Sequence, residues 1–168
     1  GTGKRLSSAT SDAEASLANI FTSFDSDGFT HGADNGVNES GQTYASWNWK
    51  AGTTGSGTTT GSGTGKAYSY SVNTTSGFSI VKYVGNGNAA QTVPHHLGTT
   101  PAVVIVKNLD ATVDGWMVYH KNLTSGKNLR LNESGMEYDA TASGLQKGIN
   151  GVPTSTNLTF VSGYASQQ

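Results

Sequence analysis

The chain has 168 residues, of which 34% are hydrophobic and 12% charged, with 23 glycines and no cysteine. Its 10 basic and 11 acidic residues give a net charge of −1, which excludes the basic surface of a nucleic-acid-binding protein. No apolar run approaches the length that crosses a bilayer, and without cysteine there is no disulfide framework. A chain rich in Gly, Ser and Thr is typical of short strands joined by turns.

The N-terminal segment, residues 1–19, contains one helix signal. Ser11 and Glu14 have the spacing of a capping box, which predicts a short helix ending near Ile20. The remaining residues, 20–168, are predicted to form a single β-sandwich domain.

A period of two dominates the rest of the chain. Residues 43–49 place Ala45, Trp47 and Trp49 on one face of a predicted strand. Residues 102–106 are continuously apolar, which predicts a central strand covered on both faces. Further strands are predicted at residues 67–72, 77–84, 116–120, 128–132 and 157–161. Many short strands at regular spacing favour an antiparallel β-sandwich or jelly roll.

Two features suggest that the domain is assembled from two sequence pieces. Residues 52–65, GTTGSGTTTGSGTG, contain no apolar side chain and are predicted to be a flexible linker or a long exposed loop. Residues 37–44 and 131–138 echo each other around Asn-Glu-Ser-Gly. Chance stays an alternative for this echo, because these residue types are common turn formers.

The motifs of both pieces resemble those of bacteriophage tail-fibre and virion proteins of marine and cyanobacterial phages. The first piece includes FDSDGF at residues 24–29 and TYASWNWKAG at residues 43–52. The second includes GFSIVKY at 77–83, HHLG at 95–98, VIVK at 104–107 and WMVYHK at 116–121. The resemblance covers about residues 18–135 and departs from the family at His96, where a glycine is usual. In the family the first motifs close a unit and the second open one, so we expect the first piece to supply strands that the second lacks.

The resemblance implies a lectin-like jelly roll that serves virion structure and host attachment, with a virion or extracellular location. The implied partners are a host cell-surface glycan or receptor, other virion proteins and further copies of the chain, a trimer being one arrangement. A purely structural spacer or capsid decoration is the alternative. A polysaccharide depolymerase is a third reading, and it needs a carboxylate pair in a groove.

Candidate binding residues follow from side-chain chemistry. Exposed aromatic faces stack on sugar rings, so Trp116, Tyr119 and His96 are the candidate carbohydrate-binding residues. Aromatic residues at strand alternation are more often part of a core, which is the competing interpretation. Exposed aromatic clusters would favour adhesion, and buried ones the structural role.

The sequence signals for metal binding and catalysis are weaker than those for a binding surface. Asp25 and Asp27 could begin a calcium loop, but the twelve-residue pattern lacks its glutamate, and an Asp-Gly turn is the alternative. No cofactor is expected, with a calcium ion at this turn as the alternative. The adjacent His95 and His96 point to opposite sides of an extended segment, so we expect a turn in which His95 binds backbone and His96 is exposed.

Enzymatic activity is not expected, and no catalytic residue is assigned. Glu137 and Asp139 share a strand face, as in some jelly-roll glucanases, but Ala142 stands where those enzymes have a third carboxylate.

Overall fold

The computed structural model describes residues 2–142 and 148–161. The strands are β1 (Lys4–Arg5), β2 (Ala15–Ser16), β3 (Phe21–Phe24), β4 (Phe29–His31), β5 (Thr53–Thr58), β6 (Thr60–Gly61), β7 (Ala67–Asn73), β8 (Phe78–Tyr83), β9 (Gln91–Pro94), β10 (Val103–Val106), β11 (Met117–His120), β12 (Lys127–Arg130), β13 (Tyr138–Asp139) and β14 (Asn157–Thr159), and the helix is α1 (Asn35–Asn38). Every strand pair is antiparallel. The prediction of an all-β antiparallel sandwich is confirmed.

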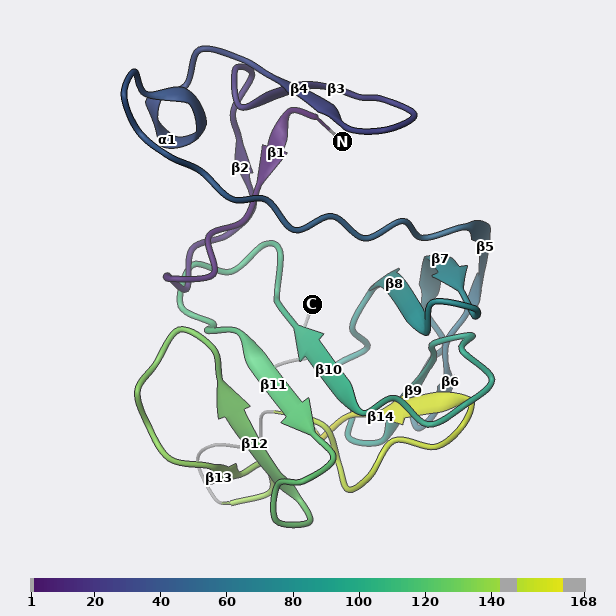
Figure 1. Ribbon diagram of the computed structural model, residues 1–168. Helices are drawn as coiled ribbons and strands as arrows, with labels where there is room; N and C mark the ends of the chain where they lie inside the picture. The colour runs from purple at the N-terminus through teal and green to yellow at the C-terminus, as the bar shows by residue number, and fades with distance from the viewer. Residues whose placement is uncertain (1, 143–147, 162–168) are drawn as a thin grey trace.

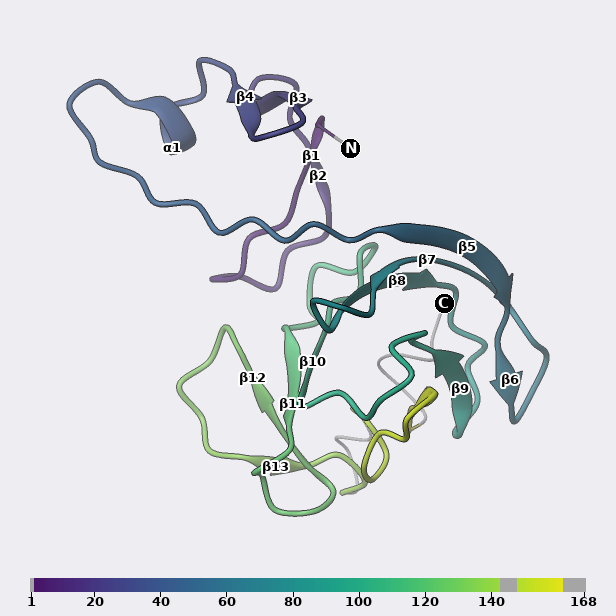
Figure 2. The ribbon, with the colours of Figure 1, turned by 45° about the vertical axis from the view of Figure 1, so that its right-hand side comes forward.

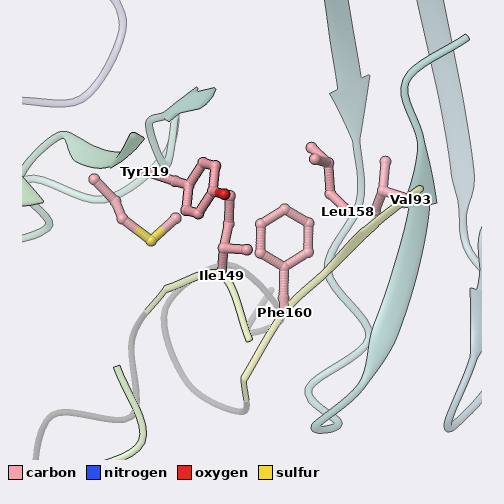
Figure 3. Close-up of a cluster of buried hydrophobic side chains, with 6 residues drawn as sticks. Val93, Tyr119, Ile149, Leu158 and Phe160 are labelled. Atoms are coloured by element: carbon pink, nitrogen blue, oxygen red, sulfur yellow. The ribbon is translucent and has the colours of Figure 1, made fainter. Parts of the chain in front are cut away.

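Three sheets form the body of the sandwich. Their strand orders are β5-β7-β8, β6-β9-β14 and β10-β11-β12-β13. Side chains from all three meet in one hydrophobic core, in which Phe160 lies between Ile149 and Leu158 (Figure 3). Phe160 is fully buried and stacks on Tyr83 of β8, with the ring centroids 5.3 Å apart. Burial of these apolar side chains is the main stabilising contribution to the body.

Residues 2–38 gather at one end of the molecule, where the β1-β2 ladder, the β3-β4 hairpin and α1 lie outside the three sheets (Figure 1). Three hydrogen bonds tie this end to the residues around the β10-β11 loop. The Trp116 indole donates to the Ser7 carbonyl at 2.8 Å, the Ser11 hydroxyl to the Thr112 carbonyl at 2.9 Å, and the Glu14 N–H to the Leu109 carbonyl at 2.8 Å.

The predicted helix over residues 11–20 is wrong. The Ser11 hydroxyl, which would cap that helix, donates to a distant carbonyl instead. Glu14 forms an ion pair with Lys4 at 3.2 Å, and Ala15 and Ser16 pair with β1 as strand β2. The short helix α1 lies further along and is capped by the Asp34 side chain. Tertiary contacts therefore override the local capping signal.

The prediction of a linker or exposed loop at residues 52–65 is also wrong, because this run forms β5 and β6. β5 pairs with β7 along its whole length, and β6 pairs with β9. The rings of Tyr70 and Tyr68 cover Gly55 and Gly57, where added Cβ atoms would lie 2.6 and 2.8 Å from the hydroxyl oxygens. The strand lacks apolar side chains of its own because its neighbour's tyrosines fill the space above it.

Two predicted strands are placed differently from expectation, whereas β7, β8, β11, β12 and β14 confirm the other strand predictions. Residues 43–49 form no strand, and every one of them is exposed. β10 is an edge strand among the described strands, with Val103 49% and Ile105 51% exposed, rather than a central one. β5 and β6 lie in the run between the two pieces, and the strands of the first piece, β3 and β4, form a separate sheet. The expectation that the first piece supplies strands to the sandwich is therefore wrong for the described residues, although Trp49 stacks on Phe78 at 5.8 Å.

Candidate functional site

The structure separates the three predicted sugar-binding residues. Tyr119 is 7% exposed and belongs to the hydrophobic core. Trp116 is half-buried, and its indole holds the N-terminal segment through Ser7. His96 lies in the loop after β9, against the tyrosines of β7. These side chains share no exposed surface on which a sugar ring could stack.

Both adjacent histidines contact other parts of the chain through their rings. The Nε2–H of buried His95 donates to the Thr154 carbonyl at 3.1 Å, and its Nδ1 accepts from the Leu97 N–H at 3.2 Å. Both ring nitrogens are therefore used in the neutral tautomer, and burial lowers the pKa of His95 below its usual value. The predicted backbone contact of His95 is confirmed.

His96 is half-buried, so the prediction that it is exposed is wrong. Its ring stacks on Tyr70 with centroids 3.6 Å apart, and its Nε2 lies 3.1 Å from the Tyr68 hydroxyl. The backbone of His96 has φ +60°, in the left-handed region that glycine adopts freely. This conformation would suit the glycine that the resemblance leads us to expect here, and the two tyrosines contact the histidine that stands in its place.

Asp25 and Asp27 lie in the turn of the β3-β4 hairpin. The Asp25 N–H donates to the Gly28 carbonyl at 2.9 Å, and the Asp25 carboxylate accepts from the Thr30 hydroxyl at 3.1 Å. These contacts are those of an Asp-Gly turn, the alternative to a calcium loop. Within residues 2–142 and 148–161, no group of three or more His, Cys, Asp or Glu side chains is placed to hold a metal ion.

The carboxylates of Glu137 and Asp139 are engaged as hydrogen-bond acceptors. Glu137 accepts from the Thr124 N–H at 3.2 Å, and Asp139 accepts from the N–H and hydroxyl of Thr141 at 2.8 and 2.7 Å. These hydrogen bonds lower the pKa of both carboxyl groups. Neither group is therefore suited to be the proton donor that glycoside hydrolysis requires.

A shallow hollow of about 230 Å³ lies where β12 ends and the chain turns toward β13. Its lining residues are Arg130, Glu133, Gly135, Met136 and Tyr138. Two backbone hydrogen bonds fix the turn, from the Leu131 N–H to the Trp116 carbonyl at 2.9 Å and from the Glu133 N–H to the Arg130 carbonyl at 3.3 Å. The sheet thus holds the arginine and the tyrosine on neighbouring strand ends, at the surface of the body.

The polar side chains of the hollow contact one another. Arg130 Nη1 donates to Glu133 Oε1 at 2.7 Å, and the guanidinium carbon lies 5.4 Å from the centre of the Tyr138 ring. The hydrogen bond to Glu133 raises the pKa of Arg130, and burial raises the pKa of Tyr138. At neutral pH the hollow therefore presents a charged donor, a neutral phenol ring and a carboxylate acceptor side by side. The thioether of Met136, 91% exposed, borders them.

Comparison with known proteins gives a family but no function. Residues 1–167 match the family described as "Domain of unknown function (DUF7483)". The chain belongs to this family. No curated protein and no solved structure matches the chain. Among the described residues, this DUF7483 domain has no helix that is long and apolar enough to cross a membrane.

A second hollow of the DUF7483 domain lies at its N-terminal end. It is larger, about 610 Å³, and is lined by Arg5, Asn19, Ala33, Asp34, Asn35 and Gly36. None of these described lining residues is aromatic, and the Asp34 carboxylate already accepts from the Gly36 N–H at 2.9 Å. It offers no apolar ring to the C–H face of a sugar and is therefore the weaker candidate.

Sequence reasoning missed Arg130, Glu133 and Tyr138 as a group. A signal was present, because the second copy of the internal echo, residues 131–138, forms most of the hollow. In the first copy the Tyr44 hydroxyl likewise closes its own loop, accepting from the Glu39 N–H at 3.1 Å. Both echoes thus end in a tyrosine that takes part in a side-chain contact near its turn, Tyr44 with Glu39 and Tyr138 with Arg130.

Proposed function

We propose that the chain is a virion attachment module of the tail-fibre type, which binds host cell-surface glycans through the hollow at Arg130, Glu133 and Tyr138. The observation that carries the proposal is the 2.7 Å pair of Arg130 and Glu133 beside the Tyr138 ring. The sequence resemblance to phage virion proteins supports the biological setting.

The chemistry of the hollow suits a sugar. Each hydroxyl of a pyranose can donate and accept a hydrogen bond. A guanidinium donates hydrogen bonds and a carboxylate accepts them, so the adjacent Arg130 and Glu133 side chains can bind two neighbouring hydroxyls of one sugar ring. The apolar C–H face of the ring has a partner in the exposed Met136 side chain, which lines the hollow together with Tyr138. About 230 Å³ lies below the roughly 300–1,000 Å³ of pockets for drug-sized ligands, which favours a single sugar unit.

A shallow site of this kind binds weakly by itself. Several copies on one fibre, or an oligomer of the chain, raise the overall avidity by roughly 10²–10⁴ without any new contact. Attachment to a repetitive surface polysaccharide is the situation in which such weak, repeated contacts suffice. The chain's near-zero net charge also avoids nonspecific attraction to charged surfaces.

The test is binding of labelled chain to a glycan panel and to host cells, before and after the surface polysaccharide is stripped. We expect binding that is lost on stripping and that Arg130→Met and Glu133→Gln reduce at least tenfold. Arg5→Met is the matched control, since it removes an arginine from the other hollow and should leave binding unchanged. Binding that survives both substitutions in folded protein would contradict the site, and absence of binding to every surface would contradict the function.

The alternative is a purely structural spacer in the virion. A specific observation favours it, because two strand-like surfaces of the chain, residues 43–49 and the outer edge of β10, are exposed and uncharged. A spacer would associate through them and bind no glycan. The binding experiment distinguishes the two functions, whereas an oligomeric state alone does not.

A further inference from the structure

Residues 43–49 have the pattern of a strand but no partner. The segment alternates with Ala45, Trp47 and Trp49 on one face, and Trp47 is 75% and Trp49 65% exposed. None of its backbone groups takes part in a backbone–backbone hydrogen bond with another described residue. Figures 1 and 2 show the trace crossing from α1 to β5 as an extended, unpaired line. Large exposed apolar side chains on a soluble chain mark an interaction surface.

The outer edge of β10 presents backbone N–H and C=O groups with which residues 43–49 could pair. Val103 pairs with His120, and the Lys121 N–H donates to the Ala102 carbonyl at 2.9 Å. Since hydrogen-bonded pairs alternate along an antiparallel ladder, Val104 and Val106 exchange bonds with β11. The N–H and C=O groups of Val103 and Ile105 therefore point outward from the sheet edge. Both side chains are also about half exposed.

Among the described residues, β10 lacks several of the usual protections of an edge strand. Exposed edge strands are commonly blocked by a charge, a proline, a bulge or a covering loop. β10 has no charged residue or proline, its pairing with β11 runs without a register shift, and no other described strand covers it. Residues 43–49 are equally free of charge. Two uncharged strands with open hydrogen-bonding groups are complementary in the way that β-augmentation requires.

The contacts at both ends of the segment keep it away from β10 of its own chain. At one end the Tyr44 hydroxyl donates to the Asn35 carbonyl at 2.9 Å. At the other end Trp49 stacks on Phe78, and the Lys50 carbonyl accepts from Asn73 at 3.4 Å. Pairing within one chain would break these contacts, whereas a second copy can approach the exposed middle of the segment without breaking them.

We propose that residues 43–49 of one copy add as a strand to the β10 edge of a second copy, with the tryptophan face over Val103 and Ile105. Two tryptophans that are 75% and 65% exposed can still contribute roughly 200–350 Å² and cover a similar area of the partner. A reciprocal exchange of two segments then buries roughly 800–1,400 Å², which reaches the lower part of the range of stable interfaces. This interface does not depend on glycan binding, because neither surface includes the hollow at Arg130.

The first test is the oligomeric state in analytical ultracentrifugation. We expect the wild-type chain to associate, and Ile105→Lys or Trp47→Ser to shift it to monomer without changing its circular dichroism. Ile80→Lys is the matched control, because Ile80 is also a half-exposed strand isoleucine, 54% against 51%, but lies on β8. A wild-type chain that is monomeric at all concentrations up to the solubility limit would overturn the proposal. So would an equal effect of Ile105→Lys and Ile80→Lys on the oligomeric state.

The second test identifies the two surfaces directly, since the chain has no cysteine of its own. Ala45→Cys is mixed with Val103→Cys or with Ile105→Cys, all single-cysteine variants, and oxidised gently. We expect a mixed disulfide dimer from at least one of these pairs, identified by mass spectrometry, and much less from Ser46→Cys, which points to the opposite face. A double variant, Ala45→Cys with Ile105→Cys, that closes its disulfide within one copy would show pairing in the same chain and overturn the proposal.

Discussion

Substitution of Gly61 by alanine distinguishes a structured glycine run from a flexible linker. Gly61 has φ +86° in strand β6, and an added Cβ would overlap the carbonyl oxygen of Ala90 and lie 3.1 Å from the Thr92 nitrogen. Ala90 cannot easily withdraw, because its N–H donates to the Phe160 carbonyl at 2.7 Å and its carbonyl accepts from the Ser62 N–H at 3.1 Å. The clash is therefore with a part of the backbone that the core itself holds in place.

The expected loss of stability follows from two contributions. The left-handed backbone conformation costs a residue with a Cβ roughly 1–2 kcal/mol. Displacing Ala90 weakens one or two hydrogen bonds, each contributing roughly 0.5–1.5 kcal/mol. The free energy of unfolding should fall by about 3 kcal/mol in urea denaturation, and Tm by about 6–12 °C for a chain of this size.

A glycine in an open position is the control. Gly28 has free space around it and no positive φ, so Gly28→Ala should change stability by less than about 0.5 kcal/mol. If residues 52–65 were a flexible linker, Gly61→Ala would be neutral or would stabilise by about 0.4–1 kcal/mol through the unfolded state. An unchanged or raised Tm would therefore refute the assignment of β6.

Three further predictions address the core, the N-terminal contact and the buried histidine. Phe160→Ala should lower the free energy of unfolding by about 3–5 kcal/mol in urea denaturation, since Phe160 is fully buried, whereas Ile80→Ala should change it little. Trp116→Phe removes the 2.8 Å hydrogen bond to Ser7, and we expect faster limited proteolysis within residues 8–14 at a cost of about 1 kcal/mol in stability. If proteolysis there is unchanged, this contact does not hold the segment. Burial lowers the pKa of His95 below 6.5, so the folded chain binds the proton more weakly than the unfolded chain, and stability should fall as the pH drops below 6.5. His95→Gln should flatten that decrease in thermal denaturation across pH 5–8, whereas His31→Gln, at an exposed position, should preserve it.

The strands that sequence reasoning identified are those whose own side chains alternate. Tyr68, Tyr70 and Val72 stand at every second position of β7, and Val81 and Tyr83 of β8 do the same on the side that packs on the core, so the pattern of both strands is visible in isolation. β5 was missed because its apolar cover comes from Tyr68 and Tyr70 of the neighbouring strand. No scan of a single segment contains that information, because pairing depends on residues distant in the sequence.

The false helix and the missed site have a related cause. Ser11 and Glu14 satisfy a local rule, but their groups find partners at Thr112 and Lys4 once the chain folds. Arg130, Glu133 and Tyr138 belong to types that are common in turns and strand ends, and only the turn between β12 and β13 brings them together. In each case long-range contacts determine the role of residues whose local pattern is ambiguous.

Methyl NMR tests most directly whether a glycan binds at the hollow. The chain has two methionines, Met136 at 91% exposure beside the hollow and Met117 at 2% exposure in the core. With both ε-methyl groups labelled with ¹³C, a host-surface oligosaccharide is titrated into the protein. We expect a saturable shift of the Met136 signal, no shift of the Met117 signal, and loss of the Met136 shift in Arg130→Met once the added methyl signal is assigned. Saturable binding of the oligosaccharide that leaves the Met136 signal unmoved would contradict a glycan site at this hollow.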